Sequence, residues 1–91
     1  MATIDKLRRH TKGKEHARKA AEIIAEKLKD KINVTYHWAG DDLEFKRSGA
    51  SGRIRVSETE VRVEIDLSLV LRPMKGMIEE KVEKYLDETL G

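Results

Sequence analysis

Strict alternation of apolar and polar residues fills the middle of the chain, and this feature limits the possible folds more than any other. A period of two places all the apolar side chains of a strand on one face. Short connections interrupt the alternation at Gly40-Asp41, within residues 48–52 and at residues 57–60. Connections this short join only antiparallel neighbours, so residues 34–71 are predicted to form a four-stranded antiparallel meander with one apolar and one charged face.

The alternation also predicts which side chains the sheet buries and which residues face one another. The side chains expected in the core include those of Tyr36, Trp38 and Phe45. A slip of one residue would expose the whole apolar set, which favours a single register. That register contains these facing pairs: Ile54 with Val63, Arg53 with Glu64, and His37 with Glu44. Gly52 is a candidate β-bulge.

In the sequence before and after the sheet segment, helical spacing of apolar residues replaces the alternation. Apolar residues recur at spacings of three, four and seven in residues 13–32 and again in residues 73–90. Asn33 tolerates the left-handed cap conformation and is expected to end the first helix. Pro73 fits the first position of the second helix, where a missing N–H costs nothing.

Two amphipathic helices and a sheet with one apolar face can all be buried if both helices cover that face. The predicted fold is therefore α+β, a two-layer α-β-β-β-β-α arrangement that forms a single domain over residues 1–91. A chain of 91 residues, of which 40% are charged and 38% hydrophobic, suits one small domain with a thin core.

Residues 1–12 form a basic N-terminal segment with a weak pattern. Residues 1–19 hold seven Lys and Arg against two Asp and Glu, a local charge of +5 in a chain whose net charge is +2. Ile4 is the best core candidate in this segment. The segment is either an extra N-terminal edge strand of the sheet or a loose basic arm.

The residue types of most catalytic and metal sites are missing or badly spaced. The chain has no cysteine, which removes disulfides and thiolate metal sites. His10 and His16 are six residues apart and so do not share a helix face as an i, i+4 metal pair does. We expect these two histidines and His37 at the surface. The glycines of residues 48–52 join strand to strand, unlike a phosphate-binding loop. We therefore expect a non-enzymatic protein with no catalytic, cofactor or metal site.

Two groups of residues remain as candidates for binding a partner. Leu67, Leu69 and Leu71 are expected on the covered face of the sheet, whereas Val70 would point to the other face. The apolar contact candidates at this strand-to-helix junction are Val70, Met74 and Met77. The candidates for contact with an anionic partner are Arg8, Arg9, Lys12, Arg53, Arg55 and Arg62.

Nucleic acid is not the favoured partner of these basic residues. Glu44, Glu64 and Asp66 are expected on the same sheet face, and no aromatic residue is placed there to stack on bases. No apolar run approaches the roughly 18 residues that span a bilayer. The basic N-terminus lacks the apolar stretch of a signal peptide. These features are compatible with a cytoplasmic location.

Nearly the whole chain resembles one family of small bacterial proteins, the polyhydroxyalkanoic acid system, or polyhydroxyalkanoate granule-region, proteins. The resemblance rests on a basic segment ending at His10 followed by an Ala-rich helix, on "VTYHWAGDDLEFKRSGASGRIRV", and on "VRVEIDLSLVLRPMKGMIEEKVEKYLDETL". It implies a non-enzymatic accessory protein near storage-polyester metabolism, with the polyester granule surface or granule proteins as partners. The alternative is a basic-face module that binds nucleic acid or another anionic partner.

Overall fold

The computed structural model describes residues 3–90; Met1, Ala2 and Gly91 of the predicted domain lie outside the described residues. Its elements follow in this order: β1 (Ile4–Arg9), α1 (Lys14–Ile32), β2 (Thr35–Ala39), β3 (Asp42–Arg47), β4 (Ala50–Val56), β5 (Glu60–Leu67), a short 3-10 helix η1 (Arg72–Met74) and α2 (Lys75–Leu90).

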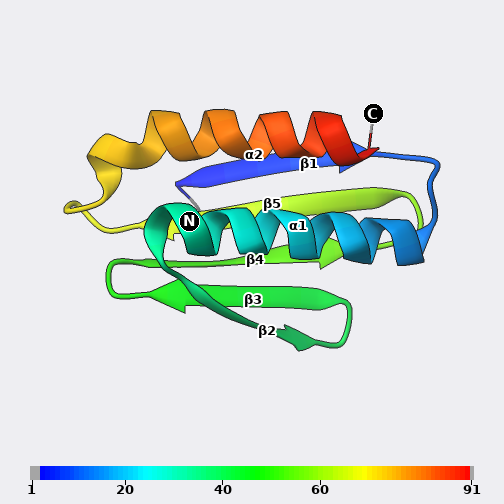
Figure 1. Cartoon of the computed structure of the whole chain (residues 1–91), viewed down its shortest axis with the longest axis horizontal. Helices are drawn as coiled ribbons and strands as arrows, with labels where there is room; N and C mark the ends of the chain where they lie inside the picture. Colours follow the sequence, from blue (N-terminus) through cyan, green and yellow to red (C-terminus); the bar gives the residue numbers. More distant parts are fainter. Residues whose placement is uncertain (1–2, 91) are drawn as a thin grey trace.

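The five strands form one antiparallel sheet in the order β1-β5-β4-β3-β2, and both helices lie on the same face (Figure 1). The predicted two-layer α+β fold is confirmed. The N-terminal segment does add an edge strand, because β1 pairs with the free side of β5 and places Ile4 opposite Ile65. Ile4 is only 1% exposed, so this buried apolar side chain anchors a strand in which four of six residues are charged.

The predicted register of the meander is confirmed in all three facing pairs: Ile54 with Val63, Arg53 with Glu64, and His37 with Glu44. The predicted bulge at Gly52 is wrong. Gly52 pairs with Phe45 on one side and Ile65 on the other in an uninterrupted register. The glycine is required for a different reason. A Cβ atom at this position would lie 2.7 Å from the ring of Phe45 and 2.3 Å from the Glu64 carbonyl oxygen.

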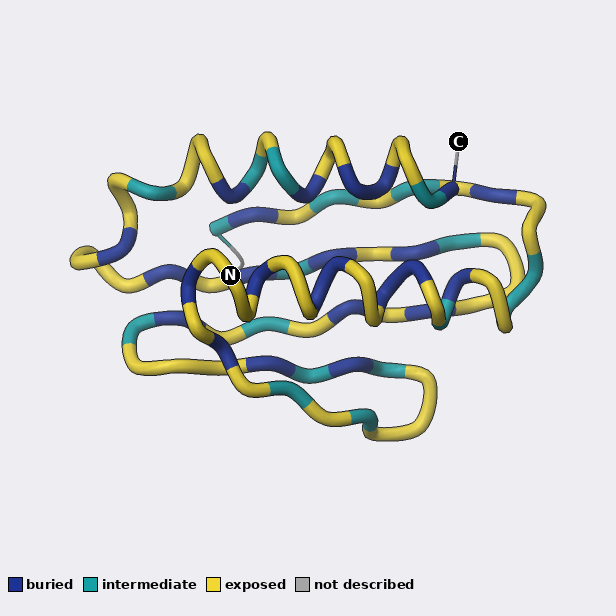
Figure 2. The backbone as a smooth tube through the Cα atoms, in the orientation of Figure 1, coloured by how far each residue is buried: buried dark blue, intermediate teal, exposed yellow. Residues whose placement is uncertain are grey.

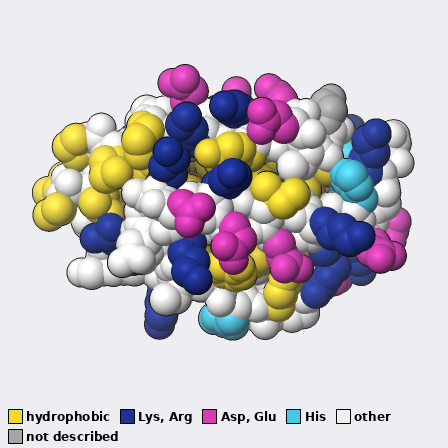
Figure 3. Space-filling view, in the orientation of Figure 1, with side chains coloured by type: hydrophobic (Ala, Val, Ile, Leu, Met, Phe, Trp, Pro, Cys, Tyr) yellow, Lys and Arg dark blue, Asp and Glu magenta, His cyan; other side chains and the backbone are white. Residues whose placement is uncertain are grey.

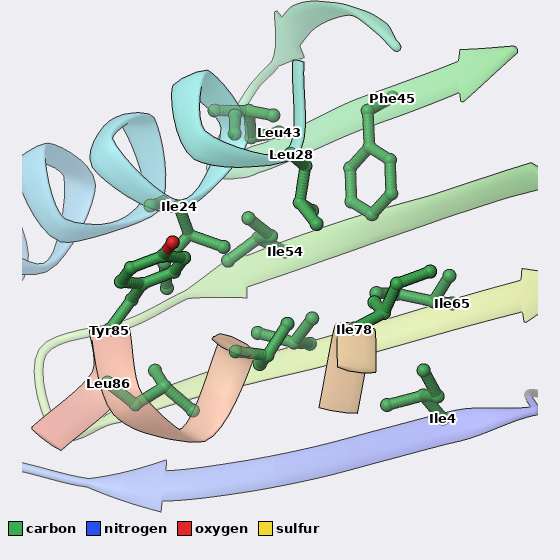
Figure 4. Packing of buried hydrophobic residues seen from close by; sticks show 14 of the residues in the cluster. Ile4, Ile24, Leu28, Leu43, Phe45, Ile54, Ile65, Ile78, Tyr85 and Leu86 are labelled. Carbon is green, nitrogen blue, oxygen red and sulfur yellow. The ribbon is translucent and has the colours of Figure 1, made fainter. Parts of the chain in front are cut away.

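One cluster of apolar side chains fills the space between the helices and the sheet. Figure 4 shows Ile24 and Leu28 of α1 and Ile78 of α2 pointing toward Ile54 and Ile65 on the strands. Alanines on the inner side of α1 let this helix approach β3, β4 and β5 closely. The exposed and buried stretches alternate along both helices (Figure 2), as expected for helices that cover one face.

Two of the aromatic residues expected in the core are less buried than predicted. Phe45 is 2% exposed, but Tyr36 and Trp38 are only partly buried and pack against the margin of the core. They lie on β2, the edge strand farthest from β1, and α1 packs over β3, β4 and β5 instead. Tyr36 and Trp38 therefore lie at the margin of the core instead of inside it, because α1 packs over β3, β4 and β5 and leaves β2 partly uncovered.

The ends of the elements differ slightly from the predicted boundaries. Asn33 caps α1 as predicted, with φ 60° and its N–H bonded to the Lys29 carbonyl at 2.8 Å. The last strand ends at Leu67 rather than residue 71, because the chain turns after Ser68. Pro73 lies in η1, and the second α-helix proper begins at Lys75.

Replacing Gly52 with alanine tests the close contact between β3, β4 and β5. Gly52→Ala should lower the free energy of unfolding by about 1–3 kcal/mol, the usual cost of overpacking a core. Gly76→Ala is the matched control, since a Cβ there meets nothing within 4 Å. The control should raise the free energy of unfolding by about 0.4–1 kcal/mol, because it reduces the entropy of the unfolded chain. Urea unfolding followed by circular dichroism measures both, and a Gly52→Ala protein as stable as wild type would contradict the contact.

Candidate functional site

The connection between β5 and α2 carries the most exposed large apolar side chains among residues 3–90. Leu69 is 79% exposed and Val70 is 84% exposed, whereas Met77 at the start of α2 is 39% exposed. Hydrophobic side chains gather at the end of the molecule where this connection projects (Figure 3). We call the side chains of Leu69, Val70, Met74 and Met77 the apolar tip.

Backbone hydrogen bonds explain why the tip projects. The Ser68 N–H donates to the Gly49 carbonyl at 2.8 Å, which ends the strand at the β3–β4 hairpin. The Ser68 carbonyl then accepts the N–H groups of Leu71 and Arg72, both at 3.0 Å. This tight turn returns Leu71 to the core, where it is 8% exposed. Leu69 and Val70 occupy the outside of the turn and face solvent.

At this junction the prediction for Leu69 was wrong and the prediction for Val70 is confirmed. Leu69 was expected on the covered face, but the turn exposes it beside Val70. Val70 is exposed as predicted. Of the two methionines, Met74 packs against the margin of the core, and Met77 is the more exposed. The exposure of Leu69 could not be predicted from the sequence, because the apolar-polar alternation continues through Leu69 although β5 ends at Leu67.

Residues 67–78, which contain the tip, carry only positive charges. Arg72 and Lys75 are exposed, and no acidic residue occurs between Asp66 and Glu79. The first turn of α2 likewise contains no acidic residue. The projecting segment therefore combines apolar side chains with two cations and no carboxylate, a composition that the sequence alone shows once the turn is located.

The residues considered for an anionic partner do not form one surface. Arg9, Arg53, Arg55 and Arg62 lie on the open face of the sheet, Arg8 faces α2, and Lys12 is exposed in the β1–α1 connection. Most are already paired. Arg62 donates two hydrogen bonds to Asp5, at 3.0 and 2.7 Å, and these bonds hold the pKa of Asp5 below its usual value. On the same open face, Arg9 pairs with Glu60 at 3.4 Å and Arg55 pairs with Glu64 at 3.6 Å.

The basic residues of β1 that face the helices are bound by acidic residues of α2. Lys6 lies 3.3 Å from Glu79 and 3.0 Å from Glu83, and its hydrogen bond to Glu83 is the main reason that its pKa is raised. Arg8 donates to Asp87 at 2.5 Å. The basic N-terminal segment and the acidic final helix thus neutralise each other within the chain.

A shallow depression on the open sheet face carries both signs of charge. It lies over Gly52 and is lined in part by His37, Glu44, Lys46, Arg53, Glu64 and Asp66. His37 and Glu44 form a surface pair at 3.3 Å. The mixture of carboxylates and cations matches neither a uniform anion site nor a uniform cation site, so the depression does not identify a ligand.

The other two histidines bind backbone carbonyl groups. His10 was expected at the surface, but it is only 7% exposed, so that prediction was wrong. Its Nδ1 accepts the Lys12 N–H at 3.2 Å, and its Nε2 therefore carries the proton that is donated to the Ser57 carbonyl, also at 3.2 Å. His16 Nε2 lies 2.6 Å from the Thr89 carbonyl oxygen.

Among residues 3–90 no group of three or more His, Cys, Asp or Glu side chains is placed so that it could hold a metal ion.

A charged cluster attaches the β2–β3 hairpin to α1. Asp41 accepts from Lys14 at 2.8 Å and from Arg18 at 3.1 Å, and Arg18 also bonds the Gly40 carbonyl at 3.0 Å. The Arg18 guanidinium lies 3.9 Å from the centre of the Trp38 ring. The hydrogen bond from Lys14, more than any other contact, keeps the pKa of Asp41 below its ordinary value.

This cluster makes the stability of the protein depend on pH in a defined direction. A carboxyl whose pKa is lowered in the folded state stabilises the fold above its ordinary pKa, 3.8 for Asp41, and loses that contribution as the pH falls through the folded-state value. Asp41→Asn should therefore be less stable than wild type at neutral pH, and the difference should shrink below the ordinary pKa. Urea unfolding across this range measures it, with Asp30→Asn as an exposed control. A difference independent of pH would contradict the ionic role.

The fold and its surfaces define a small α+β protein with an open, mixed-charge sheet face and a projecting apolar tip. The chain belongs to the family described as "Putative polyhydroxyalkanoic acid system protein", whose family model matches residues 4–90. The comparisons found no similar protein of curated function and no similar solved structure. No helix within residues 3–90 is long and apolar enough to cross a membrane.

Proposed function

We propose that this protein is a non-enzymatic accessory protein of the polyhydroxyalkanoate system, in the bacterial cytoplasm, that attaches to the surface of polyester storage granules through its apolar tip. The observation that carries the proposal is the exposure of Leu69 and Val70, at 79% and 84%, on the outside of a turn held by the Ser68 carbonyl. A turn that projects in this way can reach a flat surface before the rest of the molecule does.

The chemistry of the tip suits such a surface. A polyhydroxyalkanoate is a polymer of hydroxy acids joined by esters, so it presents alkyl groups and ester carbonyls without charge. Burying an exposed leucine or valine side chain contributes about 1.5–3 kcal/mol each. Arg72 and Lys75 beside the tip can lay their aliphatic stems on an apolar surface and keep their charges in water. Association costs free energy through lost translational and rotational freedom, so only part of this burial energy remains as binding free energy. The small remainder supports a reversible attachment.

Two further observations favour this function over the alternatives. The basic residues considered for an anionic partner are largely engaged, since Arg8, Arg9 and Arg62 each contact a carboxylate. Binding nucleic acid would require breaking these pairs. The proposal of a non-enzymatic role is supported by the histidines, which bind the Ser57 carbonyl, the Thr89 carbonyl and Glu44.

Sedimentation with isolated polyester granules tests the attachment. The double variant Leu69→Ser, Val70→Ser should keep the wild-type circular dichroism spectrum, because both side chains are exposed, and should bind at least tenfold more weakly, a loss of about 1.4 kcal/mol or more. The matched control is Leu7→Ser, Ile23→Ser, which removes two apolar side chains of 50% and 44% exposure elsewhere. The control should sediment like wild type.

Salt separates apolar attachment from ionic attachment. Granule binding through the tip should persist when the salt concentration is raised, because apolar contacts do not weaken with screening. Binding through basic residues would instead fall steeply with salt. Release of the wild-type protein by salt, or full binding of the Leu69→Ser, Val70→Ser protein, would contradict the proposed attachment site.

A further inference from the structure

The two edges of the sheet differ in how they are protected against pairing with another strand. β1 has the sequence IDKLRR, and four of its six residues are charged. Two of these, Lys6 and Arg8, point toward the helices and are bound by carboxylates of α2. Inward charges of this kind are a common protection of an edge strand. β2 has the sequence TYHWA, with no Lys, Arg, Asp, Glu or Pro, and its pairing with β3 is regular.

The unprotected edge also carries partly buried aromatic side chains. In an antiparallel strand the N–H and C=O groups of alternate residues point to opposite sides, so every second residue of β2 directs these groups away from β3. No other strand within residues 3–90 lies on that side. Tyr36 and Trp38 lie on the helix-covered face of this edge, where Tyr36 bonds Glu26 and Trp38 lies under Arg18. The edge thus offers backbone groups and aromatic area together.

We infer that a second copy of this chain pairs with β2 in an antiparallel register about a twofold axis at His37, so that one sheet continues through both copies. In this register Thr35 faces Ala39 of the second copy, and Tyr36 faces Trp38 of the second copy. Facing aromatic pairs stabilise antiparallel strands. The axis relates each contact to its equivalent, as a closed dimer requires.

Charge complementarity selects a second copy as the occupant and the antiparallel direction as its orientation. On the helix side, the Trp38 end carries Arg18 and Lys14 with their shared partner Asp41, a net charge of +1, and Glu26 lies beside Tyr36 at the other end. The twofold axis therefore brings Arg18 of one copy to the side where the other copy has Glu26. A parallel arrangement would align Arg18 with Arg18 and Glu26 with Glu26.

The open face of the sheet also has one positive and one negative end along β2, in the reverse order to the helix side. On β3, Lys46 faces Thr35 and Asp42 faces Ala39. The same axis places the Lys46 end of one copy beside the Asp42 end of the other. Both layers thus have a positive and a negative end along the edge, which an antiparallel pair matches and a parallel pair opposes.

Sedimentation equilibrium of the 10.4 kDa chain tests the pairing directly. The wild-type protein should shift from monomer to dimer as its concentration is raised from the micromolar to the millimolar range. The variant Thr35→Lys, Ala39→Lys places lysine opposite lysine at both facing positions of the dimer. It should raise the dissociation constant at least tenfold. The variant Thr35→Glu, Ala39→Glu should do the same.

Charge exchange then tests the register. An equimolar mixture of the two-lysine and two-glutamate proteins should recover the dimer, because each Lys faces a Glu. The single chain Thr35→Lys, Ala39→Glu should dimerise by itself for the same reason. The control Leu7→Lys, Ser51→Lys adds the same charge away from β2 and should dimerise like wild type. Circular dichroism should show the same fold for all of these proteins, since the four altered positions are exposed.

Clear results would overturn the inference. A wild-type protein that remains a monomer across the whole range shows that β2 does not pair with itself. A dimer that the two-lysine protein still forms lies on another surface. Failure of the mixture and of the Thr35→Lys, Ala39→Glu protein to dimerise, with the fold intact, rules out the register about His37. The inference is independent of granule attachment, because β2 and the apolar tip share no residue.

Discussion

Isoleucine, leucine and valine side chains from two helices and four strands meet over one face of the sheet, and the positions of the surface features follow from that contact. Alanines on the inner side of α1 let it lie close over β3, β4 and β5. At Gly52 the missing side chain leaves room for the Phe45 ring beside the Glu64 carbonyl. Because the helix lies there, β2 extends beyond its cover, and Tyr36 and Trp38 stay partly exposed. Because β5 must connect to α2 across the end of the same core, the connection turns outward at Leu69 and Val70.

Ion pairs between β1 and α2 neutralise much of the charge at the two ends of the sequence. The N-terminal segment is basic and the final helix acidic, and the fold brings them together: Lys6 meets Glu79 and Glu83, and Arg8 meets Asp87. These pairs are partly exposed, so each stabilises the fold only modestly. Inward-pointing charges such as Lys6 and Arg8 also disfavour pairing of the β1 edge with another strand. The uneven charge of the sequence therefore reflects an internal contact and carries little information about an external anion.

The apolar tip and the β2 edge differ in how far the sequence predicted them. Val70, Met74 and Met77 could be identified because the β-strand pattern stops at Pro73 and a helical pattern follows. Leu69 could not, because its position in the alternation is that of a buried residue. The exposed edge could not be identified either. Before the place of β1 was known, either end of the meander could have been the one left open, and only the pairing of β1 with β5 leaves β2 free.

The sequence by itself determined the properties that depend on neighbouring residues. The period of two decided the faces of the strands, short connections decided the register that pairs Ile54 with Val63, and the left-handed tolerance of asparagine decided the cap at Asn33. Only the tertiary structure decided the burial of His10, the partial exposure of Trp38 and the outward turn at Leu69. Each of these depends on a group distant in sequence. His10 is bound by the Ser57 carbonyl, the exposure of Trp38 follows from the position of α1, and the turn at Leu69 follows the bond from Ser68 to the Gly49 carbonyl. Local patterns carry no information about such distances, because the same pattern is compatible with several placements of the packed elements.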